Sequence, residues 1–267
     1  MKRLTALAVA ATLAVVLAAV AAARTSAPPV MHPGELVVGF GDPAVNFADG
    51  KIRGSSYINP KGYEVDLATD IAKALKLKPV WIYTPWAKLF APGHKDFDIS
   101  FQEATITAQR KKTVDFTSSY FDANQGVLLS KTAKAPHSIA DLKNMQTCAQ
   151  TDTTGLMWIQ QKLHPTKQPL IYQSTSAAFV AVQIGRCQAL ILDTPIVASE
   201  KKARPSKYGA VAGQIVTHEQ YGAVLPKGSK LTPVVNGIIK KLWANGTIAR
   251  EQKKWFNIDF SKIPVLK

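Results

Sequence analysis

A strand–helix–strand pattern opens with LVVGF at residues 36–40, continues with DLATDIAKALK at 66–76 and closes with PVWIY at 79–83. The first and last stretches are short, apolar and rich in β-branched and aromatic residues, as buried strands are. In the middle stretch Leu67 and Ile71 stand four positions apart, which places them on one face of a helix. This order predicts parallel strands joined by a crossover helix.

The same alternation then continues and restarts further along the chain. A third strand is expected at residues 97–101, where the sequence is FDISF. A second unit follows, with strands expected at 145–150, 170–173 and 188–192, and helices at 153–163 and 177–184. Two successive units of this kind predict an α/β protein of two lobes, each a mostly parallel sheet flanked by helices.

Two apolar segments fit neither unit: QGVLLS at 125–130 and YGAVLP at 221–226. We expect them to be paired strands that cross between the lobes and act as a hinge. An amphipathic helix at 231–243 would then return to the first lobe. This path predicts a first lobe of residues 24–124 plus 223–267 and a second lobe of residues 125–222.

The N-terminus predicts export. Lys2 and Arg3 precede a largely apolar run at 4–23 that ends in three alanines, as a secretory signal peptide does. An uncleaved anchor is the alternative, because 20 helical residues span about 30 Å. A periplasmic location would let Cys148 and Cys187 form a disulfide, with two buried free thiols as the alternative. Neither cysteine has metal-ligand spacing, and no metal site is expected.

The composition excludes several classes of protein. The chain is 46% hydrophobic, which is incompatible with intrinsic disorder, and it carries 33 Lys+Arg against 18 Asp+Glu. The basic residues are scattered and lack the interleaved aromatic residues of single-strand nucleic-acid binders. We therefore expect no nucleic-acid partner, and we assign the basic excess to solvated helix faces.

Polar residues collect where the predicted strands end, which is where open parallel sheets bind ligands. They are Asp42 after the first strand, Glu103, Thr105 and Arg110 after the third, Thr153 and Thr154 in the second lobe, and Asp193 after its last strand. A guanidinium takes a carboxylate through paired hydrogen bonds, and an aspartate can hold an ammonium group. The set suits a zwitterion. The alternatives are a surface charge at Arg110, a turn residue at Asp193 and a helix cap at Thr153.

Several blocks of the sequence resemble those of a known protein family. ATITAQR at 104–110, followed by VDFT at 114–117, resembles the TITxxR…VDFT signature of family 3 periplasmic solute-binding proteins, the polar amino-acid receptors of ABC importers. Further blocks resemble the family in order: GYEVDLA at 62–68, SIADLK at 138–143 and GRCQA at 185–189. The resemblance covers about residues 34–257.

The resemblance implies a two-lobed periplasmic-binding-protein clamp that closes on one amino-acid-like solute and presents it to a membrane ABC permease. It implies that Arg110 grips the α-carboxylate with help from Thr105 and from Thr153 or Thr154. It further implies that Asp193 holds the α-ammonium and that Trp86 stacks on the ligand, with Phe47 as a second wall. Core packing is the alternative for both aromatic residues. We expect a monomer with no catalytic residues and no cofactor.

Three positions depart from the family pattern. Asn46-Phe47-Ala48 replaces the usual Pro-Phe-Glu, Glu103 stands where Ser or Gly is customary, and Asp152 replaces a Gly. With Asp42, these acids favour a cationic or hydroxyl-bearing ligand over an acidic one. Two alternatives stay open: an enzyme resembling exported cyclohexadienyl dehydratases, with Glu103 as general acid, and an accessory protein of a periplasmic redox system.

Overall fold

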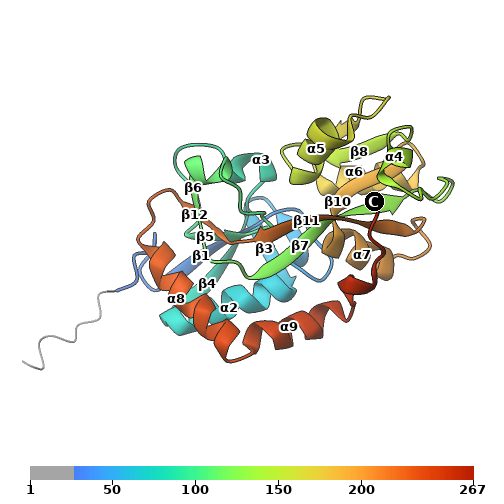
Figure 1. Ribbon diagram of the computed structural model, residues 1–267. Coiled ribbons are helices and arrows are strands. Elements are labelled where there is room, and N and C mark those ends of the chain that lie inside the picture. The colour runs from blue at the N-terminus through green and yellow to red at the C-terminus, as the bar shows by residue number, and fades with distance from the viewer. Residues whose placement is uncertain (1–26) are drawn as a thin grey trace, which may run out of the picture.

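Two β-sheets flanked by helices make up the computed structural model, which describes residues 27–267 (Figure 1). Each sheet with its helices forms one lobe, so the predicted two-lobed α/β architecture is confirmed. The predicted signal segment, residues 1–23, lies outside the described residues. Within residues 27–267 we find no helix whose length and apolar character would let it cross a bilayer.

The first lobe is built on the predicted strand–helix–strand unit. Its elements are β1 (Glu35–Phe40), β2 (Asp49–Arg53), β3 (Ser56–Lys61), α2 (Tyr63–Leu75), β4 (Lys78–Tyr83), α3 (Trp86–Leu89), β5 (Ile99–Phe101), β6 (Val114–Phe116) and, much later in the chain, β12 (Val224–Pro226). These strands stand in the order β2-β3-β4-β1-β5-β12-β6. β1 runs parallel to both β4 and β5, which confirms the crossover through α2.

Helix α2 packs against this sheet through the face that the sequence predicts. Leu67 and Ile71 are fully buried in the lobe's core. The helix begins at Tyr63, earlier than expected, directly after Gly62. At Gly62 the backbone φ is 142°, and a Cβ would lie 2.1 Å from the carbonyl oxygen of Phe47, so only glycine fits there.

The sheets are mixed rather than mostly parallel. In the first lobe β2 and β3 form an antiparallel hairpin, and β12 lies antiparallel between β5 and β6. The sequence did not predict the hairpin, because most of its residues are at least partly exposed and therefore show no apolar strand pattern. The parallel strands nevertheless form the centre of the lobe.

The second lobe repeats the arrangement on a smaller scale. Its elements are β7 (Phe121–Leu129), α4 (Ile139–Leu142), β8 (Thr147–Gln150), α5 (Thr154–Trp158), β9 (Leu170–Tyr172), α6 (Thr175–Gln183), β10 (Ala189–Asp193), α7 (Thr194–Ala203) and β11 (Val211–Tyr221). The strand order is β11-β7-β10-β8-β9, with β8 parallel to β9 and to β10. The predicted helix at 153–163 is α5 continued by a π-helical turn, Ile159–Leu163.

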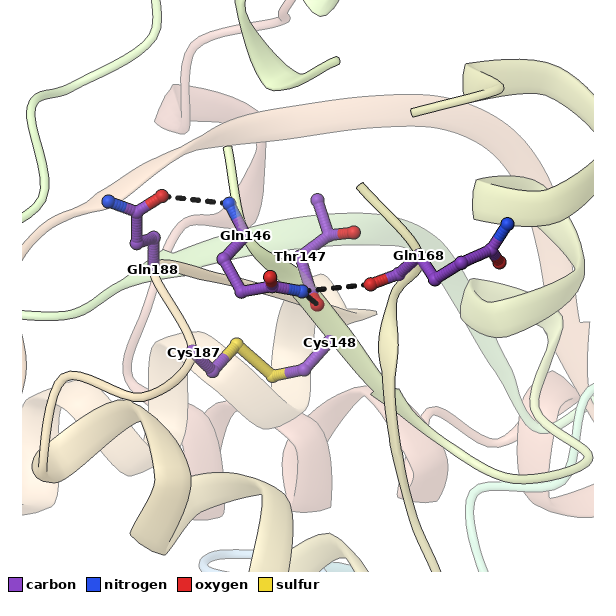
Figure 2. The surroundings of a disulfide bond; sticks show 6 residues. All are labelled: Gln146, Thr147, Cys148, Gln168, Cys187 and Gln188. Carbon is purple, nitrogen blue, oxygen red and sulfur yellow. Dashed lines mark hydrogen bonds between the residues drawn. A yellow bond between two sulfur atoms is a disulfide. The ribbon is translucent and has the colours of Figure 1, made fainter. Parts of the chain in front are cut away.

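A disulfide ties the core of the second lobe together. Cys148 on β8 bonds to Cys187 just before β10, as Figure 2 shows, which confirms the predicted pairing. Both residues are fully buried, and the Gln188 side chain accepts the backbone N–H of Gln146 at 2.8 Å beside them. The bond therefore joins the two parallel strands whose ends carry predicted site residues.

The chain crosses between the lobes in β7 and β11, which pair antiparallel (Figure 1). The predicted segment 125–130 lies largely in β7, but the assignment of 221–226 as its partner is wrong. Only Tyr221 belongs to β11, and Val224–Pro226 forms β12 in the first sheet. The true partner was missed because β11 is polar and partly exposed along much of its length.

The C-terminal segment returns to the first lobe and then leaves it. Helices α8 (Leu231–Ala244) and α9 (Thr247–Phe256) lie beside α2, as expected for the returning segment. The last residues instead run onto the second lobe, where Val265 pairs with Gln214 and Leu266 is buried in that lobe's core. The first lobe thus does not extend to residue 267 as predicted.

Candidate functional site

A cavity of about 290 Å³ lies between the lobes. Its walls come from the chain just beyond β1 and β5 in the first lobe, and beyond β8 and β10 together with α6 and α7 in the second. The carboxyl ends of these strands are where an open α/β sheet is expected to bind ligands. The predicted residues that line the cavity are Asp42, Trp86, Glu103, Thr153 and Asp193.

Arg110 is not among the residues that line the cavity, and its guanidinium bonds to both lobes. Its Nη1 donates to the carbonyl of Thr105 at 2.8 Å, and Nη2 donates to the carbonyl of Asp152 in the second lobe at 2.9 Å. The guanidinium carbon lies 4.2 Å from the centre of the Phe90 ring and 5.2 Å from that of Trp86. Burial lowers the pKa of Arg110 to about 10, while the charges of Asp193 and Glu219 oppose that shift, so the group stays cationic at neutral pH.

Trp86, the first residue of α3, makes a second contact between the lobes. Its indole Nε1 donates to the carbonyl of Thr151 at 3.1 Å, next to the carbonyl that Arg110 engages. The lobes therefore meet along this edge of the cavity. Asp152 has a backbone φ of 57°, which explains why glycine is customary there and why an aspartate is among the tolerated replacements.

Asp193 supplies an acidic group from the second lobe. It ends β10 with only 7% of its surface exposed, and its Oδ1 accepts the Gln125 Nε2–H at 2.6 Å. Burial and the charge of Glu219 raise the pKa of Asp193 to about 8, although the Arg110 charge pulls it down. Gln125 itself is fully buried on β7, so the carboxylate is held by the hinge.

Glu219 on β11 is the functional candidate that the sequence reasoning missed. Its Oε2 accepts the hydroxyl protons of Thr105 at 2.7 Å and of Thr154 at 2.6 Å, and its Oε1 accepts Gln125 Nε2 at 3.1 Å. The two threonines that were expected to contact a ligand thus bond to the protein's own carboxylate. No local motif marks Glu219, because its approach to the cleft depends on the pairing of β11 with β7.

Glu103 lines the cavity in a left-handed backbone conformation, with φ at 48°. Its N–H donates to Glu64 Oε1 at 2.9 Å, and the Tyr120 hydroxyl donates to the same oxygen. Glu64 is fully buried in the first turn of α2. Burial raises the pKa of both carboxyls, and their closeness raises that of Glu103 further. A residue such as glycine adopts this backbone conformation more readily, in keeping with the family's usual choice.

Two other predicted residues differ in their surroundings. Phe47 does not line the cavity: it is fully buried and packs against Phe256 and Phe121, with ring centres 4.7 and 5.6 Å away. The preceding Asn46 has φ at 69°, a value closed to the proline customary there. Asp42 does line the cavity, and its Oδ1 accepts the Tyr83 hydroxyl proton at 3.1 Å.

Among residues 27–267, no cluster of three or more His, Cys, Asp or Glu is arranged to hold a metal ion.

Comparison with known sequences places these features in a family. The profile of the bacterial extracellular solute-binding proteins, family 3, matches residues 46–258. The glutamine-binding protein GlnH of a Bacillus subtilis ABC transporter is 30% identical over 205 residues, which is 74% of each chain. A probable histidine-binding protein of Neisseria gonorrhoeae is 30% identical over 204 residues, covering 74% of this chain and 75% of that one.

Solved structures agree with the sequence comparison. The arginine-, lysine-, histidine-binding protein ArtJ of Geobacillus stearothermophilus superposes with a TM-score of 0.73 at 26% identity, covering 84% of this chain and 96% of that one. The ancestral amino acid-binding protein AncCDT-1, a precursor of cyclohexadienyl dehydratase, gives 0.72 at 30% identity, covering 84% and 95%. These relatives are named as binding proteins. As the motifs predicted, the chain belongs to the bacterial extracellular solute-binding proteins, family 3.

Proposed function

We propose that this protein is an exported receptor that binds one amino acid, or a close analogue, between its lobes and delivers it to an ABC permease. The observation that carries this proposal is Asp193, a buried carboxylate that faces the cavity. Among the described residues, no lysine or arginine forms a salt bridge with it. Ionising a buried acid without a salt-bridge partner is costly, and a ligand ammonium group would supply that partner.

Arg110 is the proposed anchor for the other end of the ligand. Its two hydrogen bonds go to main-chain carbonyls, and both leave the positive charge without a bonded counter-ion. A ligand carboxylate that reached the guanidinium would gain a charge-assisted, two-point contact. The face of Trp86 lines the adjoining wall and would contact the same part of the ligand. Thr153 lines that wall too, but its hydroxyl donates to the Gln150 carbonyl at 2.7 Å and accepts the Leu156 N–H, so it is the helix cap of α5 and has no proton left for a ligand.

The remaining walls favour a basic or hydroxyl-bearing side chain. Asp42 and Glu103 line the cavity from the first lobe, and Glu200 lines it from α7, where Arg204 and Tyr208 already bond to it. An acidic ligand side chain would meet the Asp42 carboxylate from the first lobe. The relatives named above bind glutamine, histidine, arginine or lysine by name, none of which is acidic.

Calorimetry tests the proposal directly. The protein lacking residues 1–23 would be titrated with a panel of amino acids, polyamines and small organic acids. We expect at least one L-amino acid to bind with a Kd of about 1 μM or tighter, equivalent to about −8 kcal/mol. No heat and no thermal stabilisation from any member of the panel would contradict the receptor proposal.

The enzyme alternative is not favoured, because the relatives are named as binding proteins. Glu103 does have the raised pKa that a general acid would need. The same protein preparation can therefore be assayed with arogenate and prephenate. We expect no turnover above that of the Glu103→Gln variant.

A further inference from the structure

The hydrogen bonds around Glu219 fix the direction in which two threonine hydroxyls point. A hydroxyl has a single proton to donate and otherwise offers lone pairs. Thr105 and Thr154 both direct that proton to Glu219 Oε2, at 2.7 and 2.6 Å. Neither hydroxyl then keeps a proton for a ligand carboxylate, which is the role expected for Thr105. Thr154 Oγ1 also accepts the Gln125 Nε2–H at 3.1 Å, so that hydroxyl is bonded within the protein on two sides, whereas Thr105 Oγ1 keeps its acceptor capacity.

Gln125 also directs its amide protons to carboxylates, those of Asp193 and Glu219. Its Nε2 lies 2.6 Å from Asp193 Oδ1 and 3.1 Å from Glu219 Oε1, so the amide faces carboxylates on two strands. Its Oε1 is buried without a hydrogen-bond partner in the described residues and lies against Gly155. This orientation places the amide protons between the acids. The Gln125 amide bonds only to Oδ1 of Asp193, which leaves Oδ2 free of it. The charge of Glu219 also acts on Asp193.

The position of Glu219 results from an irregularity in the hinge. Ile215 pairs with Gln125 and Glu219 pairs with Ala123, so β11 bulges between these pairs. The bulge is held by Asn124, whose Oδ1 accepts the N–H groups of Thr217 and His218 at 3.0 and 3.1 Å. Bulges commonly re-aim a side chain beside a functional site. Here Glu219 reaches Thr105 of the first lobe and Thr154 of the second.

We propose that Glu219 is a positioning residue that turns the side-chain donors at the hinge end of the cleft away from the ligand, so that this end selects ligands that carry a positively charged amino group. It does so by accepting hydrogen bonds from the hydroxyls of Thr105 and Thr154 and by orienting the Gln125 amide toward Asp193. The inference rests on the proposed function, and it goes further by assigning selectivity to a residue outside the cavity wall. It also moves Thr105 from the carboxylate end of the ligand to the ammonium end.

A ratio of affinities tests this role. Wild-type protein and Glu219→Gln would each be titrated with L-arginine, L-glutamine and L-histidine, and with the 2-hydroxy acid analogue of each. The analogue carries a neutral hydroxyl in place of the α-ammonium group and is otherwise the same molecule. We expect the variant to reduce the preference for the amino acid over its analogue by about 10-fold or more, which corresponds to about 1.4 kcal/mol. Asp122→Asn, which removes an exposed carboxylate from the same hinge, should leave the preference unchanged.

The outcomes separate the two proposals. If Glu219 served only to hold the hinge together, Glu219→Gln would weaken amino acid and analogue equally, and an unchanged ratio would overturn the inference while leaving the receptor function intact. If the wild-type protein bound none of the amino acids, the proposed function and this inference would fall together. Should Glu219→Gln fold poorly, Thr154→Val removes one of the two donors, and Thr154→Ser retains it. We then expect the ratio to fall in the valine variant alone.

Discussion

The two ends of the cleft are built in different ways. At the Arg110 end, the guanidinium, the Thr105 carbonyl and the surrounding turn come from one short stretch of chain, and the contacts across the cleft go to main-chain carbonyls. At the Asp193 end, side chains from β7, β10 and β11 bond to one another. The first end is therefore specified locally, whereas the second exists only once the hinge strands have paired. The local end can be read as a motif. Of the end assembled by strand pairing, the sequence showed Asp193 at the end of its own strand but gave no sign of Glu219.

Replacing Arg110 tests the locally built end and should have the largest effect. Arg110→Met keeps an unbranched apolar side chain but removes the guanidinium over the Phe90 ring, its charge and both hydrogen bonds. Losing a buried charge partner costs about 2–5 kcal/mol, so amino-acid affinity should fall by at least about 30-fold in calorimetry. Arg53→Met, at an exposed position in β2, is the control and should bind normally. Normal binding by Arg110→Met would show that the guanidinium does not meet the ligand.

Replacing Asp193 tests the end assembled by the hinge. Asp193→Asn keeps the shape and an acceptor oxygen but removes the negative charge opposite the proposed ammonium group. Hydrogen bonds to charged groups contribute about 1.5–3 kcal/mol, so we expect a loss of about 10- to 100-fold in affinity by calorimetry. Asp122→Asn serves as the matched control on β7. An undiminished affinity in Asp193→Asn would contradict the assignment of this end to the ammonium group.

The pH dependence of binding sharpens the same test. In the free protein the pKa of Asp193 is raised to about 8, so much of the carboxyl is protonated at neutral pH. An ammonium group beside it favours the charged form and lowers that pKa in the complex. The complex then holds fewer protons than the free protein, so affinity should rise as pH increases from about 6 to 8, with proton release on binding. Asp193→Asn should lose this dependence, as titrations in buffers of different ionisation enthalpy would reveal.

The same contrast explains which features the sequence predicts. The strands β1, β4 and β10 were recognised because each carries a continuous apolar run, and Arg110 was singled out from its motif. Strand β11 is polar and half-exposed, so it offered no strand pattern, and Glu219 was missed with it. Phe47 was misplaced for another reason. An aromatic residue in a core and one in a pocket wall give the same sequence signal, and only the packing against Phe121 and Phe256 separates them.

Trp86 offers the smallest and most specific test, at the edge where the lobes meet. Trp86→Phe keeps an aromatic face for the ligand but removes the Nε1–H bond to the Thr151 carbonyl. A single hydrogen bond contributes about 0.5–1.5 kcal/mol, so the closed form should lose a small part of its stability relative to the open form. We expect affinity to fall by about 2- to 10-fold, and X-ray scattering of the free protein should shift toward a larger radius of gyration.

The matched control for this substitution is Trp81→Phe, because Trp81 stacks on Phe40 within the first lobe and does not line the cavity. It should alter neither affinity nor radius. If Trp86→Phe weakened binding without any change in scattering, the indole would act through the ligand rather than through closure. The Arg110 bond to the Asp152 carbonyl lies beside the Trp86 bond to the Thr151 carbonyl. If both bonds hold the same closed edge, the variant that combines Arg110→Met with Trp86→Phe should lose less binding free energy than the sum of the two single losses.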